Sequence, residues 1–270
     1  MKTPILFLLA VLFAEVNIPA QKTNPVRLHP ENPHYFLFRG KPEILITSAE
    51  HYGSVMNKDF DFIKYLNTLQ KEGFNYTRLF CSGHLEMNDA TFGIERNTMN
   101  PRKESYLAPW KKMKDGEPKS PGVYDLNQWN DEYFQRLKLF VKEASLRGIV
   151  VEITLSSSIY NESIWSYNPL NPINNINLSD PRYFKLANTL YNGEMLLFQE
   201  RYISKIVTEL NEFDNIIYEI QNEPWSDHPC LQEIIPNDNK THPFAWQKLA
   251  ETADPVSHLW QHHMAEIITK

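Results

Sequence analysis

The chain has 270 residues, of which 42% are hydrophobic and 13% aromatic, so it can bury a sizeable core and is not a disordered linker. Its length matches one complete α/β barrel, which takes about 250 residues. The net charge is −6, from 27 basic and 33 acidic residues, and a chain of this weakly acidic character is not expected to bind nucleic acid.

The first 20 residues are typical of a secretory signal peptide. Lys2 precedes an apolar run of ten residues, 4–13, and the small side chain of Ala20 suits a cleavage site. This run is too short to cross a bilayer, and no later stretch is long and apolar enough, so no membrane span is expected. A buried N-terminal helix is the alternative interpretation. We therefore expect a secreted or periplasmic protein from which residues 1–20 are removed.

Strands and helices are predicted to alternate along the rest of the chain. Apolar residues recur three or four positions apart in the helical segments, and Gly73 and Gly148 mark two helix ends. The segment EILITS, from Glu43, is rich in the β-branched residues that favour strands. In chain order we expect a short hairpin over residues 26–40, strands over 43–48, 74–80, 149–155 and 216–221, and helices over 57–71, 130–147, 181–210 (with an interruption at 192–193) and 254–268.

The connections between these elements differ in length at the two ends of the predicted sheet. Turns from helix to strand are very short, whereas the three loops from strand to helix are long, at residues 81–129, 156–179 and 222–253. In parallel α/β folds the functional site lies at the carboxyl ends of the strands, where these long loops follow. No G-x-G-x-x-G motif follows the first strand, which argues against a dinucleotide-binding sheet. We therefore predict an α/β fold of the TIM (β/α)8-barrel type, with about the first four βα units present in this chain.

The fourth predicted strand ends in residues that suit carbohydrate chemistry, namely Asn222, Glu223, Pro224 and Trp225. Glycoside hydrolysis needs a carboxyl group that protonates the leaving oxygen. An adjacent amide can hydrogen-bond a sugar hydroxyl, and an indole ring can stack on the apolar face of a sugar. An ordinary loop that opens with Asn-Glu-Pro is the alternative interpretation of the same residues.

Asn222-Glu223, together with Arg78 on the second strand, resembles the retaining glycoside hydrolases of clan A, which are cellulase- and mannanase-like (β/α)8 enzymes. The resemblance runs from about residue 26 to the end of the chain. It implies that Glu223 is the general acid/base, that Asn222 contacts the 2-hydroxyl of the sugar, and that Arg78 keeps the nucleophile ionised by pairing with it. A structural salt bridge is the alternative role of Arg78, and Glu219 is one possible partner.

Further candidates for substrate binding follow the other predicted strands. They are His51 and Tyr52 after the first strand, His84 after the second, Trp165 after the third and Trp225 after the fourth. A histidine buried at the rim of the barrel and a tryptophan that only fills a loop are the alternative interpretations. We expect these residues to line a site for a polysaccharide or oligosaccharide, whose identity stays open, as does the choice between endo and exo action.

The cysteines and one pair of histidines predict neither a disulfide framework nor a metal site. The chain has only two cysteines, Cys81 and Cys230, which are too few for a disulfide framework. Export would allow a bridge between them, although two buried thiols are the state that we expect. His258 and His262 are four residues apart in the last helix but lack the H-E-x-x-H pattern, so a solvated face is expected. No metal and no other cofactor is predicted.

A second carboxylate is missing from the predicted site. A retaining glycosidase needs two carboxylates about 5–5.5 Å apart, and the resemblance places the nucleophile at the end of a seventh strand, whereas four strands are predicted here. We therefore expect residues 21–270 to be the N-terminal half of a secreted catalytic domain that hydrolyses β-linked glycosidic bonds with retention. This half is truncated before the nucleophile and is expected to be nearly inactive as it stands.

Two other interpretations of the chain stay open. A non-catalytic carbohydrate-binding half-barrel or pseudoenzyme would bind oligosaccharide without cleaving it, and would pair with itself or another chain to cover its open edges. A secreted barrel hydrolase that uses a metal is the third interpretation. These alternatives differ from the first in what they do to a bound glycan and in their metal content.

Overall fold

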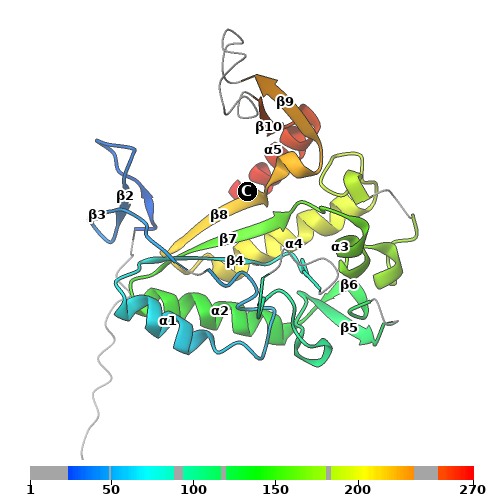
Figure 1. The fold of residues 1–270 in the computed structure, drawn as a ribbon, viewed down its shortest axis with the longest axis horizontal. Helices are drawn as coiled ribbons and strands as arrows, with labels where there is room; N and C mark the ends of the chain where they lie inside the picture. Colours follow the sequence, from blue (N-terminus) through cyan, green and yellow to red (C-terminus); the bar gives the residue numbers. More distant parts are fainter. Residues whose placement is uncertain (1–23, 49, 88–93, 117–119, 181–183, 234–248) are drawn as a thin grey trace, which may run out of the picture.

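A sheet of parallel strands lies at the centre of the computed structural model, which describes residues 24–48, 50–87, 94–116, 120–180, 184–233 and 249–270. The order of its three strands is β4 (Tyr76–Phe80), β7 (Val150–Ser157) and β8 (Ile216–Asn222) (Figure 1). The register places Arg78 beside Glu152, and Thr154 beside Glu219. Polar side chains of all three strands therefore come together near the middle of the sheet.

Three helices lie along this sheet: α1 (Phe62–Lys71), α2 (Asp131–Leu146) and α4 (Met195–Leu210) (Figure 1). Each of them precedes a parallel strand, so the chain consists of successive α/β units. Gly73 and Gly148 lie in the turns after α1 and α2 with φ angles of 81° and 71°, a left-handed conformation that glycine adopts without steric cost. The second, third and fourth predicted strands and the two glycine helix ends are confirmed.

One hydrophobic core lies between the helices and the sheet. Leu66 of α1, Phe140 of α2, Ile153 of β7 and Ile206 of α4 are each 0% exposed. The rings of Phe62 and Phe140 meet edge to face, with their centroids 5.4 Å apart. Burying a side chain of this size stabilises a fold by about 1.5–3 kcal/mol, so the apolar stripes of the helices account for the position of each helix on the sheet.

A small antiparallel sheet precedes the parallel strands and consists of β1 (Arg27–Leu28), β2 (Phe36–Phe38) and β3 (Lys41–Glu43). β1 and β2 form the hairpin predicted over residues 26–40, and β3 adds a third strand to it. Arg39 anchors this sheet to the rest of the chain. Its guanidinium binds the two carboxylate oxygens of Asp214 at 2.9 and 2.8 Å and the carbonyl oxygen of Ser145 at 3.0 Å.

The predicted strand over residues 43–48 is wrong. The segment runs beside β4 without forming a ladder: the backbone of Asn75 donates to the carbonyl of Ile46 at 3.1 Å, but the backbone of Ile46 donates to the side-chain oxygen of Asn75 at 2.8 Å. The side chains of Ile44 and Ile46 are 60% and 52% exposed. A side-chain amide thus replaces the backbone partner that a strand needs, and the apolar residues do not pack inside a barrel.

The starts of two helices differ from the prediction. The first helix begins at Phe62 rather than at Asn57, because the side chain of Asp61 accepts a hydrogen bond from the backbone of the first turn at 3.0 Å. Asn130 precedes α2 as predicted but does not cap it. Its side-chain amide instead donates to the carbonyl of Ala108 at 3.0 Å, so this amide holds the preceding loop.

Only the second part of the helix predicted over residues 181–210 is a helix in the structure, since α4 begins at Met195. Residues 181–183 lie outside the described part, and residues 184–186 form a 3-10 turn. The interruption expected at 192–193 is present, and the side chain of Asn192 donates to Gln199 of α4 at 2.7 Å. The indole of Trp260, in the last helix, donates to the same Gln199 oxygen at 3.1 Å, which fixes that helix against α4.

The long loops contain further elements that the sequence did not predict. They are the antiparallel pair β5 (Trp110–Lys114) and β6 (Val123–Trp129), the helix α3 (Glu162–Tyr167), and the antiparallel pair β9 (Pro229–Glu233) and β10 (Leu249–Ala253). The last helix, α5 (Pro255–Thr269), begins at the predicted Asp254-Pro255 signal, with the Asp254 side chain as its cap. Short strands of this kind are stabilised by pairing with each other, which their own sequence does not reveal.

The parallel strands do not close into a barrel within the described residues. β4 and β8 are the two edge strands of a three-stranded sheet. The prediction of an α/β fold with parallel strands is therefore confirmed, whereas the described residues do not show a closed TIM barrel. The expected signal peptide, residues 1–20, lies outside the described part. In the part that is described, no helix combines the length and the apolar character needed to cross a membrane.

Both cysteines are free thiols in the structure. Cys81 is 0% exposed, and burial raises the pKa of its thiol to about 12. Cys230 is half-buried in β9. The structure therefore contains two separate thiols, of which Cys81 is buried as expected and Cys230 is not fully buried.

Candidate active site

The candidate site is a cavity of about 430 Å³ at the carboxyl ends of the parallel strands. Phe80 of β4, Tyr160 after β7, and Asn222 and Glu223 at the end of β8 all contribute to its wall. Arg78, Glu86 and residues 50–52 and 94–99 complete the lining. Of the eight predicted site residues, the cavity brings together five, which are His51, Tyr52, Arg78, Asn222 and Glu223.

Arg78 of β4 contacts acidic side chains of β7 and β8. Its Nε lies 3.3 Å from Oε1 of Glu152 and 2.9 Å from Oε2 of Glu219, and its Nη2 donates to the side-chain oxygen of Asn222 at 2.8 Å. Burial alone lowers the pKa of Arg78, but the hydrogen bond and charge of Glu219 and the charge of Glu152 outweigh it and raise the pKa. The salt bridge with Glu219 that the sequence left open is therefore present, and it leaves Arg78 in contact with Asn222.

Glu223 leaves β8 with a left-handed backbone, at φ 49° and ψ 52°. A residue other than glycine adopts this conformation at a cost of about 1–2 kcal/mol. Two contacts hold it there: the hydroxyl of Ser158 donates to its carbonyl oxygen at 2.6 Å, and the hydroxyl of Tyr160 donates to its Oε2 at 2.7 Å. The side chain is exposed and lines the cavity, so the turn presents an accessible carboxylate to a ligand.

Tyr160 connects two of the predicted residues and was not itself predicted. Its hydroxyl accepts a hydrogen bond from the amide of Asn222 at 2.8 Å and donates to Glu223 at 2.7 Å. Burial and then the hydrogen bond with Glu223 raise the pKa of Tyr160, so the hydroxyl keeps its proton at neutral pH. Arg78, Asn222, Tyr160 and Glu223 form one chain of hydrogen bonds. The signal that could have found Tyr160 is its position just after the carboxyl end of β7.

A buried carboxylate fixes the loop that carries Tyr160. Asp227 is 3% exposed and accepts hydrogen bonds from the backbone of Ile159 at 2.8 Å, from Asn188 at 2.8 Å and from Gln221 at 2.9 Å. Burial raises the pKa of Asp227, against the opposing effect of these hydrogen bonds. Because Ile159 precedes Tyr160 and Gln221 precedes Asn222 in sequence, Asp227 couples the two segments whose side chains meet at Glu223.

We expect Tyr160→Phe to lower the free energy of unfolding by about 1 kcal/mol. The side-chain amide of Asn222 loses the nearer of its two acceptors, the Tyr160 hydroxyl, while the aromatic ring stays packed. Urea denaturation of the purified chain measures the change. Tyr35→Phe is the control, since this side chain is 39% exposed, and its midpoint should equal that of the wild type. A Tyr160→Phe midpoint that also equals the wild type would contradict the hydrogen-bonded chain.

Tyr52 and His51 form the wall of the cavity next to Arg78. The ring of Tyr52 stacks on that of Phe80, with centroids 4.8 Å apart, and the guanidinium carbon of Arg78 lies 5.3 Å from the Tyr52 ring centroid. Burial and a hydrogen bond to Glu50 raise the pKa of Tyr52 to about 12. Burial lowers the pKa of His51. Both residues reach the cavity, and their predicted roles in substrate binding stay predictions.

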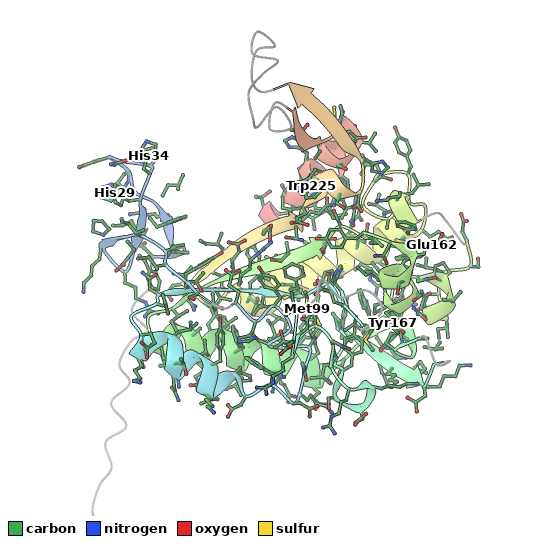
Figure 2. All side chains as sticks on the ribbon, viewed as in Figure 1. His29, His34, Met99, Glu162, Tyr167 and Trp225 are labelled. Atoms are coloured by element: carbon green, nitrogen blue, oxygen red, sulfur yellow. The ribbon has the colours of Figure 1, made fainter. Side chains whose placement is uncertain are left out.

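The other three predicted residues do not line this cavity. His84 is 1% exposed, and its ring packs edge to face against Phe80 and Tyr160. Trp165 in α3 is 8% exposed and belongs to the core. Trp225 is half-buried in the 3-10 turn Pro224–Ser226 that follows Glu223 (Figure 2). The structure thus places Trp165 in the core rather than on the cavity wall as a platform for a sugar.

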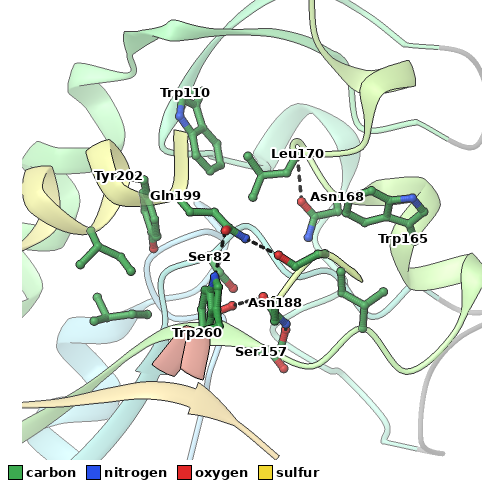
Figure 3. Close-up of a pocket in the computed structure, with 15 residues that line it drawn as sticks. Ser82, Trp110, Ser157, Trp165, Asn168, Leu170, Asn188, Gln199, Tyr202 and Trp260 are labelled. Carbon is green, nitrogen blue, oxygen red and sulfur yellow. Dashed lines mark hydrogen bonds between the residues drawn. The ribbon is translucent and has the colours of Figure 1, made fainter. Parts of the chain in front are cut away.

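Trp165 instead lines a second, much smaller cavity of about 30 Å³ in the core. Trp110, Tyr202, Gln199 and Trp260 meet around it (Figure 3). A volume of this size holds one or two water molecules, so it cannot hold a sugar ring. The residues around it join α4, α5 and the loop after β4, and this cavity has a structural role.

The acidic residues of the described part do not form a metal site. Nowhere in that part does a group of three or more His, Cys, Asp or Glu side chains have an arrangement that could hold a metal ion. His258 and His262 are exposed on α5. The carboxylates that line the large cavity are those of Glu50, Glu86, Glu95 and Glu223. Among these, Glu223 is the carboxylate that directly follows a parallel strand, and the other three come from loops.

No family model matches this sequence, and no curated protein matches it either. Among solved structures, the chain is similar to an endo-1,4-beta-mannanase from Rhizomucor miehei, with a TM-score of 0.50 and 14% identity over 92% of this chain and 57% of that one. It is also similar to a candidate glycoside hydrolase of Bacteroides vulgatus ATCC 8482, with a TM-score of 0.50 and 16% identity over 75% of this chain and 32% of that one. A family 5 glycoside hydrolase of the same organism gives a TM-score of 0.44 and 13% identity over 91% of this chain and 37% of that one.

The two structures with a TM-score of 0.50 show a similarity of fold. The chain spans 57% or less of each of those three structures, and at such low identity the match concerns the fold alone. The described strands and helices are similar in fold to part of those two structures. The resemblance expected from Arg78 and Asn222-Glu223 is thereby confirmed as structural similarity.

Proposed function

We propose that this chain is the N-terminal part of a secreted or periplasmic glycoside hydrolase that cleaves β-linked bonds of a polysaccharide or oligosaccharide with retention. The observation that carries the proposal is the hydrogen-bonded chain from Arg78 through Asn222 and Tyr160 to Glu223, at the wall of a cavity of about 430 Å³. A cavity at the carboxyl ends of parallel strands is the usual position of such a site. The partial-barrel fold supports the same class of activity.

Glu223 would act as the general acid and then as the general base. In the first step its carboxyl proton moves to the glycosidic oxygen while the bond from that oxygen to the anomeric carbon breaks and the nucleophile binds that carbon. In the second step the Glu223 carboxylate takes a proton from water, whose oxygen replaces the nucleophile. We propose that the nucleophile comes from a strand that follows the fourth βα unit in a longer chain.

Asn222 and Arg78 would orient the sugar rather than exchange protons with it. The side-chain oxygen of Asn222 is held by Arg78 at 2.8 Å, and its amide nitrogen donates to Tyr160 at 2.8 Å. An amide nitrogen carries two hydrogens, and the second makes only a long contact of 3.4 Å with the hydroxyl of Ser157, which a sugar hydroxyl can replace. Arg78 therefore acts on the substrate through Asn222, in addition to any role beside the nucleophile.

Reading the gene beyond codon 270 and expressing the resulting longer chain tests this proposal. We expect further βα units with a glutamate at a strand end, hydrolysis of β-linked glycans by the longer chain, and little or no hydrolysis by residues 21–270. Non-coding sequence directly after codon 270, or rapid turnover by residues 21–270 alone, would contradict it.

A non-catalytic carbohydrate-binding half-barrel is the second candidate function. The observation that favours it is that the other carboxylates of the cavity, Glu50, Glu86 and Glu95, come from loops and not from strand ends. Sedimentation and product analysis separate the two candidates. A stable dimer of residues 21–270 that binds oligosaccharide, together with a longer chain that releases no reducing ends, would establish the second candidate.

A further inference from the structure

Glu86 is a nearly buried carboxylate on the wall of the cavity, and the site described so far does not use it. It is 5% exposed and lines the cavity. The amide of Asn97 donates to its Oε2 at 2.5 Å, and its backbone nitrogen donates to the carbonyl of Met99 at 2.9 Å (Figure 2 labels Met99). These contacts hold the carboxylate in place and leave Oε1 without a hydrogen-bond donor among the described residues.

His84 is the group within ion-pair distance of Glu86 in the described part, with its Nε2 3.8 Å from Oε1. It does not supply a positive charge, because burial lowers the pKa of His84 to about 4 and leaves the imidazole neutral near pH 7. The distance of 3.8 Å is also too long for a hydrogen bond. His84 Nε2 has no hydrogen-bond partner among the described residues. The imidazole therefore gives the carboxylate neither a charge nor a hydrogen bond.

The charges around the cavity leave Glu86 uncompensated. Of the two arginines that line it, Arg78 pairs with Glu219 and Glu152, and Arg96 is exposed. A buried carboxylate without a cationic partner is costly, and burial together with the charge of Glu223 raises the pKa of Glu86. A ligand that brings a positive charge to this wall favours the ionised carboxylate and gains stabilisation from it. An ammonium group carries three donors and no acceptor, which matches a carboxylate oxygen that lacks a donor.

We propose that Glu86 is a specificity-determining residue that binds the protonated amine of a sugar, so that the preferred glycan contains amino sugar units. The inference rests on the proposed function, since it names the substrate class of the same cavity. His84 packs against Tyr160, with ring centroids 5.9 Å apart, and the Tyr160 hydroxyl donates to Glu223. The amino sugar is therefore either the unit whose glycosidic bond Glu223 protonates or the unit next to it.

Binding of two matched oligosaccharides to the 270-residue chain tests the inference. The first is a β-1,4-linked glucosamine oligomer and the second is its fully N-acetylated counterpart, titrated by calorimetry at about pH 6, where the free amine is protonated. We expect the wild type to bind the glucosamine oligomer about tenfold more tightly, as for one charge-assisted hydrogen bond. This comparison needs no variant, and equal affinities would overturn the inference.

Two variants locate the preference within the cavity. Glu86→Gln keeps the shape of the side chain and should remove the tenfold preference. Glu95→Gln makes the same charge change at an exposed residue that lines the same cavity and should retain it. A preference that survives in Glu86→Gln would overturn the assignment to this residue. Binding of neutral β-glycans without any preference for the amine would overturn the inference alone, whereas a lack of binding to every β-glycan would overturn the proposed function with it.

Discussion

In the longer chain that we propose, a Glu223→Gln variant is expected to lose about 10²- to 10⁴-fold in turnover of natural β-glycans. An amide cannot donate a proton to the leaving oxygen or accept one from water, so both steps of the reaction lose their proton transfer. The side chain keeps its shape, and the hydroxyl of Tyr160, which donates to Oε2 at 2.7 Å, can donate to the amide oxygen instead. Glycan binding should therefore change little.

Initial rates and calorimetric titration of the variant measure these two effects separately. Glu266→Gln is a matched control, because Glu266 is exposed on α5, and it should retain wild-type turnover. Retained hydrolysis in Glu223→Gln would remove Glu223 from the mechanism. Loss of binding together with turnover would assign Glu223 to substrate binding rather than to proton transfer.

Replacing Arg78 with leucine is expected to lower the free energy of unfolding of the 270-residue chain by about 3 kcal/mol. The Arg78 side chain is 15% exposed and pairs with Glu219 and Glu152, whose side chains are 26% and 22% exposed. Removing the cation leaves two carboxylates side by side in a partly buried position, and it also removes the donor that holds Asn222. Urea denaturation followed by circular dichroism measures the loss.

Two further variants distinguish the contribution of the partly buried ion pairs of Arg78 from the effect of its positive charge alone. Arg78→Lys keeps the charge but cannot bind Glu219 and Asn222 with a planar fork, so its stability should lie between those of the wild type and Arg78→Leu. Arg102→Leu removes an arginine that is 68% exposed and pairs with Asp59 at the surface, and its midpoint should stay close to that of the wild type. Equal midpoints for Arg78→Leu and Arg102→Leu would show that the cluster around Arg78 does not stabilise the fold.

The sequence predicted the central part of the fold because its local and long-range signals agree. The segments that became β4, β7 and β8 follow helices with a clear apolar stripe, and two of those helices end at a glycine with a positive φ. The predicted strand over residues 43–48 failed because a strand needs a backbone partner. There the side chain of Asn75 accepts the hydrogen bond of Ile46 in place of a neighbouring backbone.

The site could be predicted only where residues lie at strand ends. Arg78, Asn222 and Glu223 follow from the strand pattern and from the resemblance, and the structure brings all three to one cavity. Tyr160 and Glu86 lie in loops, and their positions depend on tertiary contacts: Asp227 holds the first loop, and the backbone of Met99 holds the second. No periodicity in the sequence carries that information.

Titration of the 270-residue chain with a β-1,4-linked oligosaccharide, followed by nuclear magnetic resonance, tests most directly whether this cavity is a glycan site. The side-chain amide of Asn222 and the Nε–H of Arg78 report on the hydrogen-bonded chain, since the two side chains are joined by an Nη2 to Oδ1 hydrogen bond of 2.8 Å. We predict that their resonances shift on binding, along with those of Tyr160. Binding without any change at these three residues, or shifts that cluster elsewhere, would contradict the account.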